Sequence, residues 1–232
     1  LLPLVRRTNQ SAKSVALFRA STGEFPKAAC AGVTETAASL GFGIVFESEF
    51  DASCQDFTAE MAKIEAAEPD VVVIVGRVQN DLRLARQLVE SSINVGVVVA
   101  VAAGIQGFLD DLGSLAERFI GPSQWEPDAL YIADFGPTTE QVIASIAREG
   151  YQTVDYPMAQ AYAAGVVVQR CLEKAGSADS HDLREAASSL QFSTFYGNFQ
   201  IDGETGRQIG RETLLVQWQD GKKAIVWPQS SG

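Results

Sequence analysis

The feature that most constrains the fold is a run of five apolar β-branched residues, Val71–Val75, between Asp70 and Gly76. Successive side chains of a strand point to opposite faces of its sheet, so a strand that is apolar at every position must be covered on both faces. Parallel sheets meet this condition because the helices that connect their strands pack on both sides. The run therefore predicts a central strand of a parallel α/β sheet.

Short apolar segments alternate with amphipathic segments on both sides of this run. The expected strands are residues 15–19, 42–47, 95–101 and a short edge strand at 118–120. The expected helices are residues 25–40 ending at Gly41, a helix capped by Ser53, one around residues 82–89, and a weak one around residues 108–112. Regular alternation of strand and helix indicates a parallel sheet with right-handed crossovers.

The second half of the chain is organised differently. Residues 121–127 contain two prolines and one glycine, which predicts a loop or a crossing between domains. The pattern beyond them predicts helices over residues 139–149, 158–174 and 182–190, strands over residues 199–202 and 213–219, and a hairpin turn at Asp220-Gly221 leading into residues 222–227. The three helices need a sheet to pack on, and the strands predicted around them are too few to supply one.

The charge of the chain excludes two classes of partner. The chain has 232 residues and a net charge of −11, from 18 basic and 29 acidic residues. Nucleic-acid binding and electrostatic docking on an anionic membrane both require clustered Lys and Arg, so we expect neither. The length suits one large domain or two small ones, and the longest apolar runs fall well short of the ~20 residues that span a bilayer.

Residues that carry catalysis or hold cofactors are sparse. No predicted strand is followed by Gly-x-Gly-x-x-Gly or by a Walker A sequence, and the acidic residues are spread at solvent spacing rather than clustered as metal ligands. His181, the single histidine, follows Asp179 and Ser180 at a predicted helix start, which is typical of an ordinary first-turn residue. We therefore expect no catalytic residues, no metal site and no cofactor.

The cysteines and the N-terminus add little about function. Cys30, Cys54 and Cys171 lie far apart, so neither a zinc site nor a redox pair is indicated. Cys30 and Cys171 lie in Ala-rich helical segments and are predicted to be buried free thiols, although the sequence leaves one disulfide open. The chain starts at Leu1 without a signal-peptide pattern, which favours a processed product or a piece of a longer chain.

A binding protein is the class that remains, and its site is expected at the carboxyl ends of the parallel strands. The loops there supply hydroxyls, an amide, a guanidinium and helix N-terminal N–H groups, which suit a small solute with a carboxylate. The expected ligand-binding residues are Ser21, Thr22, Gly23, Arg77, Gln79, Ala103, Gly104 and Trp125. Three alternatives stay open: Thr22 caps a helix, Arg77 pairs with Asp81 on the surface, or Trp125 only packs at a hinge.

Several longer strings carry a family resemblance. These are residues 69–76, residues 121–127, Tyr156-Pro157 followed by Ala161-Tyr162-Ala163-Ala164-Gly165, residues 194–199, residues 206–210 and residues 216–222. In their order and spacing they resemble the type I periplasmic solute-binding proteins. The resemblance is to the leucine/isoleucine/valine-binding branch, the receptors of branched-chain-type amino-acid ABC transporters, and it covers essentially the whole chain.

The resemblance implies a two-lobed fold with three crossings and a ligand cleft between the lobes. Residues 1–121 then correspond to a complete second lobe and residues 122–127 to the interlobe crossing. Residues 128–193 correspond to the helical part of an incomplete first lobe, and residues 194–232 to a further crossing segment and a C-terminal hairpin. The N-terminal part of the family fold, about 100–150 residues, is expected to be missing. An apolar stripe on the long helix, formed by Ala161, Val168 and Leu172, should then be exposed.

The resemblance also implies a function. We expect an extracytoplasmic or periplasmic solute-binding receptor of an ABC importer, with a signal peptide or lipid anchor in the missing part. Its partners would be a small amino-acid-like or carboxylate-bearing apolar ligand, bound by hinge closure, and the membrane permease subunits. The family's acidic partner for a ligand ammonium is absent at Ala102-Ala103-Gly104. The alternatives are a ligand-sensing receptor or regulator of the same fold and a hydrolase that uses His181.

Overall fold

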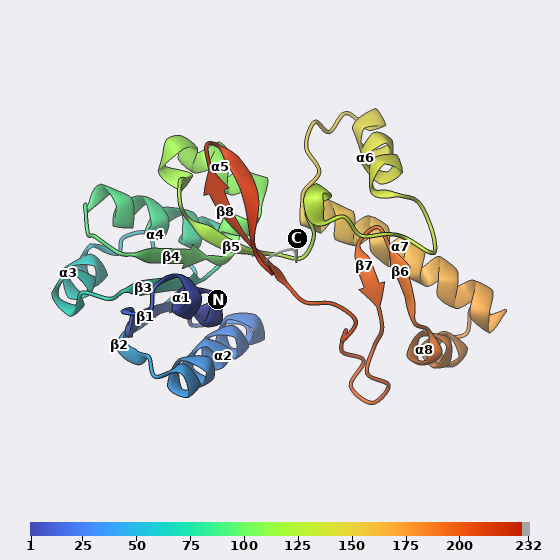
Figure 1. The fold of residues 1–232 in the computed structure, drawn as a ribbon, viewed down its shortest axis with the longest axis horizontal. Coiled ribbons are helices and arrows are strands. Elements are labelled where there is room, and N and C mark those ends of the chain that lie inside the picture. The colour runs from blue at the N-terminus through green and yellow to red at the C-terminus, as the bar shows by residue number, and fades with distance from the viewer. Residues whose placement is uncertain (229–232) are drawn as a thin grey trace. The chain divides into compact units, whose positions relative to one another are not determined.

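The computed structural model describes residues 1–228 of the chain, which form two compact units (Figure 1). The first unit contains Leu1–Pro122 together with the C-terminal residues from Leu215 onward, and the second contains Ser123–Leu214. The chain therefore leaves the first unit, builds the second, and returns to the first for its last two strands.

The first unit is built on a seven-stranded sheet with the strand order β2-β1-β3-β4-β5-β8-β9. The strands are β1 (Ser14–Ala20), β2 (Gly43–Phe50), β3 (Val71–Val75), β4 (Val97–Ala100), β5 (Ile120–Ser123), β8 (Leu214–Gln219) and β9 (Lys222–Trp227). The pairs β1–β2, β1–β3, β3–β4 and β4–β5 are parallel, whereas β8 and β9 pair antiparallel. The mostly parallel sheet confirms the predicted fold class.

Helices cover both faces of this sheet, as the apolar run of β3 predicted. The helices are α1 (Leu2–Thr8), α2 (Glu24–Leu40), α3 (Thr58–Ala67), α4 (Val78–Glu90) and α5 (Gln106–Leu112), with 3-10 helices η1 (Val101–Gly104) and η2 (Gly113–Ala116). Val72 and Ile74 of β3 pack in one cluster with residues of α3, α4 and α5. Val71, Val73 and Val75 pack in another cluster with residues of α1 and α2. All five β3 side chains are consequently buried.

Two helix ends test the expectations about capping. Helix α2 ends as predicted at Gly41, which adopts the left-handed conformation with φ of 72°. The prediction that Ser53 caps the following helix is wrong, because α3 starts five residues later at Thr58. The hydroxyl and the backbone N–H of Ser53 both donate to the carboxylate of Asp51, at 2.7 and 2.8 Å. This local turn satisfies the groups that would otherwise have capped the helix.

The expectation of an edge strand near residue 120 is also wrong. Strand β8 lies beside β5, and the backbone amides of Arg118 and Trp218 donate to the carbonyls of Trp218 and Phe119, at 2.9 and 3.1 Å. The predicted hairpin turn between β8 and β9 is confirmed. Asp220 and Gly221 both have positive φ, 52° and 71°, as the twist of a two-residue hairpin requires.

The second unit consists of three helices and a small sheet. The helices are α6 (Thr139–Arg148), α7 (Tyr156–Ala175) and α8 (Ser180–Ser189), preceded by the 3-10 helix η3 (Pro127–Ala129). All three α-helices were predicted, and Thr138 caps α6 through a reciprocal bond with Gln141. The predicted strand at residues 199–202 is replaced by an antiparallel pair, β6 (Phe192–Thr194) and β7 (Gly197–Phe199), and by an isolated bridge between Ile201 and Gln208.

The core of the second unit is small. Its main cluster of buried residues contains Trp125, Val142, Ala159, Ala163, Phe195 and Tyr196. The stripe predicted on α7 is exposed: Ala161 is exposed, and Val168 and Leu172 keep 52% and 38% of their surface accessible. Within residues 1–228, no helix combines the length and the apolar composition that a bilayer crossing requires. The three cysteines are free thiols, and Cys30 and Cys171 are buried as predicted.

Candidate functional site

The carboxyl ends of the parallel strands lie next to one another in the first unit. In the sheet register, Arg19 of β1 pairs with Val75 of β3, and Ile74 of β3 pairs with Ala100 of β4. The strands therefore end level with each other, and their loops emerge side by side. The loop after β2 joins them, because Ala20 pairs with Phe50. Open α/β sheets bind their ligands outside this edge.

The loop after β1 presents exposed polar groups. Ser21, Thr22 and Gly23 are all exposed, and the backbone N–H of Ser21 donates to the carbonyl of Phe50 at 2.8 Å. Gly23, not Thr22, occupies the N-cap position of α2, with φ of 103°, and no side chain caps this helix. The alternative that Thr22 caps the helix is therefore wrong.

The loop after β3 ends at Arg77, and Gln79 lies in the first turn of α4. Both residues are exposed, and Arg77 is the N-cap residue of α4. The pKa of Asp51 is lowered, first by the hydrogen bonds from Ser53 and to a lesser extent by the positive charge of Arg77. The guanidinium therefore acts on a carboxylate at the end of β2, on the same edge of the sheet. The alternative that Arg77 pairs with Asp81 on the surface is wrong, because Asp81 is completely buried.

Asp81 and its neighbour Asn80 are the polar residues that the sequence reasoning missed. The carboxylate of Asp81 accepts the backbone N–H of Gly76 at 2.8 Å and that of Ala102 at 2.9 Å. Burial raises the pKa of Asp81 to about 7, and the amides of Ala102, Gly76 and Val101 act in the opposite direction. The signal in the sequence was helical spacing, because Asp81 precedes the buried Leu84 and Leu88 on the same face of α4.

Asn80 is 1% exposed and holds a different loop. Its Nδ2 donates to the carbonyl oxygens of Ala52 and Cys54, at 3.1 and 3.3 Å, in the loop between β2 and α3. Its Oδ1 is buried and has no hydrogen-bond partner among residues 1–228. The side chain is thus placed to fix backbone rather than to reach solvent.

Ala103 and Gly104 lie in η1, directly after β4, and both are buried. The carbonyl of Ala103 accepts a hydrogen bond from the indole Nε1 of Trp218 at 2.9 Å. The carbonyl of Gly104 accepts one from the Nζ of Lys223 at 3.2 Å. Their backbone is therefore held by the C-terminal hairpin. At this position the loop contributes its backbone rather than side-chain chemistry.

Trp125 belongs to the second unit and is 1% exposed. Its Nε1 donates to the carbonyl of Phe195 at 3.0 Å, and its ring meets the ring of Phe195 edge-on. The neighbouring Gln124 accepts from Arg211, whose guanidinium lies 4.0 Å from the centroid of the Tyr196 ring. The structure thus favours a packing role for Trp125 within its own unit.

His181 lies in the first turn of α8, as predicted, and is exposed. A surface groove of about 720 Å³ runs past it, lined by Ser180, His181, Arg184, Glu185, Ser188, Ser189 and Gly203. The hydroxyls of Ser188 and Ser189 donate to helix carbonyls at 2.9 Å, so they are used within the helix. No group of three or more His, Cys, Asp or Glu side chains that could hold a metal ion occurs within the described part of the chain.

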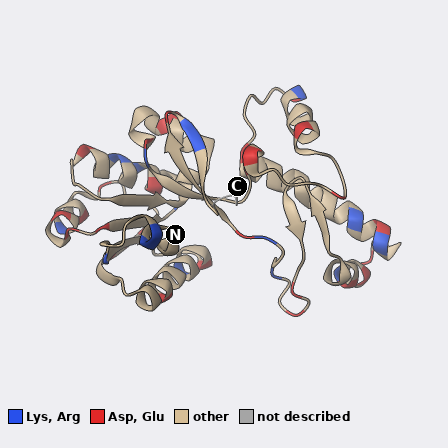
Figure 2. Cartoon of the chain, in the orientation of Figure 1, with Lys and Arg blue, Asp and Glu red and all other residues tan. Residues whose placement is uncertain are grey.

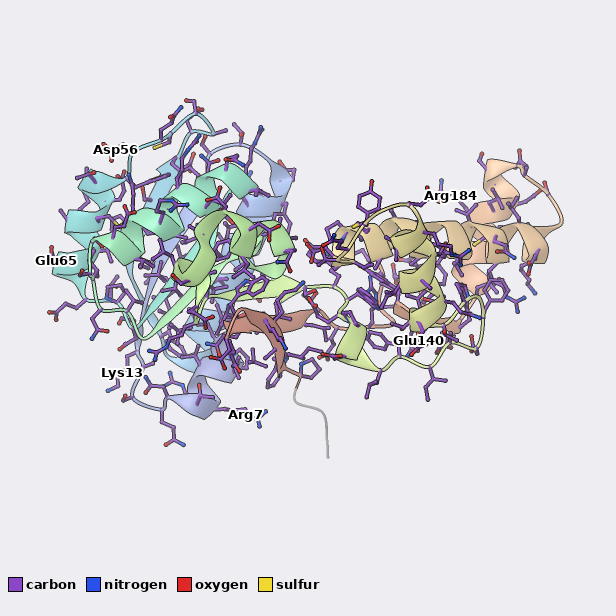
Figure 3. All side chains as sticks on the ribbon, turned by 90° about the horizontal axis from the view of Figure 1, so that it is seen from above. Arg7, Lys13, Asp56, Glu65, Glu140 and Arg184 are labelled. Carbon is purple, nitrogen blue, oxygen red and sulfur yellow. The ribbon has the colours of Figure 1, made fainter. Side chains whose placement is uncertain are left out.

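Lys, Arg, Asp and Glu are distributed along the helices, strands and loops of both units (Figure 2). Asp56 and Glu65, for example, lie at the periphery of the first unit (Figure 3). The ion pairs are small groups, such as Arg86 with Asp111 at 2.7 Å and Arg19 with Glu47 and Glu49. The exposed polar edge formed by the loops after β1, β2 and β3 is therefore the best candidate for a binding site in the first unit.

Comparison with known proteins gives a family and a fold. The family model described as periplasmic binding protein matches residues 3–223. A leucine-binding protein from Thermotoga maritima is 22% identical, with a TM-score of 0.82 over 97% of this chain and 62% of its own. A solute-binding protein of an ABC transporter from R. palustris, solved with benzoate, is 14% identical with a TM-score of 0.75, over 96% of this chain and 59% of its own.

A third similar structure is the amino-acid ABC transporter substrate-binding protein from Pseudomonas fluorescens. It is 20% identical, with a TM-score of 0.77 over 93% of this chain and 56% of its own. At these identities the likeness establishes the fold. The chain spans about three fifths of the length of these proteins.

Proposed function

The chain belongs to the periplasmic binding protein family, and from this premise we propose that it is a solute-binding receptor of an ABC importer that takes a carboxylate-bearing, largely apolar solute. The family consists of extracytoplasmic solute receptors rather than enzymes. Its members bind and release their ligands without bond chemistry, so the proposal requires a recognition surface and no catalytic group.

The observation that supports the proposal is the polar edge of the first unit. Exposed hydroxyls of Ser21 and Thr22, the guanidinium of Arg77 and the amide of Gln79 come from neighbouring loops at the carboxyl ends of β1 and β3. Arg77 is also the N-cap residue of α4, at a helix N-terminus that no side chain caps. A guanidinium and a helix N-terminus both favour an anion, and a carboxylate fits both.

The contacts divide by chemistry. We propose that Arg77 binds the ligand carboxylate, that Ser21, Thr22 and Gln79 donate or accept hydrogen bonds, and that Gly23 lets the backbone approach the ligand.

Ala103 and Gly104 would form the adjacent backbone wall. The Ala at position 103 offers no charge to a ligand ammonium, which favours solutes whose recognition depends on the acid. Trp125 would shape its own unit rather than contact the ligand. Leucine and benzoate, named for two similar structures, both carry a carboxylate next to an apolar body.

The mechanism proposed is the one that the family fold implies. The ligand would bind between two lobes and be enclosed by hinge closure, and the closed form would dock on the permease subunits of the importer. Closure contributes free energy because it removes the apolar part of the solute from water.

Calorimetric titration of L-leucine, benzoate and their amides into the protein in its longest natural form tests this function. The acids should bind and the amides should bind far more weakly. Arg77→Ala should weaken acid binding by about 1.5–3 kcal/mol, the loss of a hydrogen bond to a charged group. Arg118→Ala is the matched control, because Arg118 is an exposed arginine at the other, amino-terminal end of β5. Equal binding of acid and amide, or an unchanged affinity in Arg77→Ala, would contradict the proposal.

A further inference from the structure

Two adjacent polar residues at the start of α4 are buried, although carboxylate and amide side chains are usually exposed to water. Asn80 is 1% exposed and Asp81 is 0% exposed. Burying a carboxylate is costly unless its oxygens accept hydrogen bonds, so such a group is expected to have a specific structural reason.

The hydrogen bonds of these two residues reach three different loops. Asp81 accepts the N–H of Gly76 in the loop after β3 and the N–H of Ala102 in η1 after β4, at 2.8 and 2.9 Å. Asn80 donates to the carbonyls of Ala52 and Cys54 in the loop after β2, at 3.1 and 3.3 Å. These loops leave neighbouring regions of the sheet at its carboxyl edge.

Glycine at position 76 is part of the same arrangement. A Cβ atom there would lie 2.6 Å from Oδ1 of Asp81 and 3.2 Å from Cβ of Asn80. The first distance is too short for non-bonded atoms and the second is a tight contact. The carboxylate cannot move aside without losing the amides of Gly76 and Ala102 as donors. Only glycine lets the end of β3 approach the buried carboxylate this closely.

We propose that Asn80 and Asp81 are positioning residues that hold the loops after β2, β3 and β4 in one fixed arrangement at the binding edge. The part of this inference that concerns binding rests on the proposed function. Asp81 has backbone amides as its partners, and one of them, the amide of Ala102, lies 21 residues away in sequence. Fixing these loops before the ligand arrives lowers the conformational entropy that binding has to remove.

The structure offers a matched control at the opposite end of the same sheet. The carboxylate of Asp70 accepts the backbone amides of Lys13 and Ser14, at 2.7 and 2.9 Å, beside the amino ends of β1 and β3. Asp70→Asn and Asp81→Asn therefore remove the same kind of interaction, one distant from the proposed binding edge and one at it.

Hydrogen exchange of backbone amides in the ligand-free protein tests the holding role directly. In Asp81→Asn the amides of Gly76 and Ala102 should exchange at least about tenfold faster than in the natural protein, as loss of about 1.4 kcal/mol of protection implies. The amides within β1 should keep their protection. In Asp70→Asn the change should appear at Ser14 and not at the binding edge. Unchanged exchange at Gly76 and Ala102 in Asp81→Asn would overturn the proposal.

The second measurement concerns affinity for whichever of L-leucine and benzoate the natural protein binds. Asp81→Asn should weaken that affinity by about tenfold or more, whereas Asp70→Asn should leave it unchanged. Loosened loops with an affinity equal to that of the natural protein would refute the positioning role. If neither compound binds the natural protein, the proposed function fails, and the exchange measurement still decides the holding role. Should Asp81→Asn fail to fold, Asn80→Ala is the second variant, expected to speed exchange in residues 52–54 and to weaken affinity likewise.

Discussion

The two units of the chain differ in how far their apolar residues are buried. In the first unit, the five side chains of β3 are buried between helices on both faces of a seven-stranded sheet. In the second unit, the longest helix, α7, buries four residues, and Val168 and Leu172 remain exposed. Leu130 and Ile132, in the segment between η3 and α6, keep 86% and 88% of their surface accessible.

The spacing of apolar residues predicts a helix or a strand, but it does not predict which segment packs against it. The spacing of apolar residues in α7 correctly indicated a helix, just as the run in β3 indicated a strand. The β3 residues are covered because the sheet brings distant segments to both of its faces. The helices of the second unit have a two-stranded sheet, β6–β7, as their sheet partner, and one face of α7 remains in contact with solvent. Three predictions test this contrast.

The largest effect is expected where the first unit is packed most tightly. A Cβ atom on Gly121 would lie 2.1 Å from the backbone nitrogen of Gly104 and 2.3 Å from the carbonyl carbon of Ala103. Neither backbone atom can move without disturbing the contacts between β5 and η1, so Gly121→Ala should lower the free energy of unfolding by about 3 kcal/mol or more. Urea unfolding followed by circular dichroism measures this change.

The matched control for that variant is Gly107→Ala. Gly107 lies in α5, and a Cβ atom there would have no neighbour within 4 Å. Alanine favours a helix over glycine, so this variant should be as stable as the natural protein or more stable. Equal destabilisation by the two substitutions would show that the packing of the first unit is looser than the contrast between the units requires.

The second prediction concerns the buried carboxylate of the first unit. Burial raises the pKa of Asp81 from 3.8 to about 7. Between these values the folded protein keeps a proton that the unfolded chain has released, so the free energy of unfolding should fall as the pH rises through this window. The slope from one such group is at most about 1.4 kcal/mol per pH unit, and it should disappear above the folded pKa.

Asp81→Asn cannot titrate and should lack this contribution. Urea unfolding of both proteins at several pH values between 4 and 8 measures the difference between their two curves. The natural protein should lose stability relative to the variant as the pH rises, whatever constant cost the substitution adds. Parallel curves over the whole range would contradict the assigned titration.

The smallest effect on stability is expected in the exposed part of the second unit. Leu130→Asn with Ile132→Asn should change the free energy of unfolding by less than about 0.5 kcal/mol, because both side chains are largely in water. Asn also tolerates the positive φ of 51° at position 130. The same double variant should bind less of a hydrophobic fluorescent dye. Val142→Ala, at a fully buried position of α6, should instead destabilise by about 1–3 kcal/mol. Unchanged dye binding in the double variant would show that these two residues are not an accessible apolar surface.

Local signals in the sequence predicted most of the helices and strands. The β-branched run of β3, the helix end at Gly41 and the turn at Asp220-Gly221 depend on the preferences of a few neighbouring residues, and all three were found. The edge strand was wrong because β8, about one hundred residues later, lies beside β5. No local pattern in residues 118–120 carries that information.

The candidate site likewise has features that local sequence predicts and features that depend on contacts with distant segments. The exposed positions of Thr22, Arg77 and Gln79 at the ends of strands could be predicted from the strand order expected for a parallel sheet. The buried position of Asp81 could not be predicted from its charge. Its hydrogen-bond donors are backbone amides, which nearly every residue has, so the sequence does not identify them. Its position one turn before Leu84 was the available signal, and it conflicted with the expectation that a carboxylate stays in water.

The first unit is interrupted in the sequence, and this has a consequence for biosynthesis. Trp218 is 1% exposed and donates to the carbonyl of Ala103, a residue made 115 positions earlier. While the ribosome adds the intervening segment, β5 has an unpaired side, and its backbone groups are open to association with other nascent chains. Strand β5 gains its second neighbour only after residues 214–227 have emerged. A chain whose translation stops within the second unit therefore carries an open β-sheet edge, which makes it a preferred target for chaperones and for aggregation.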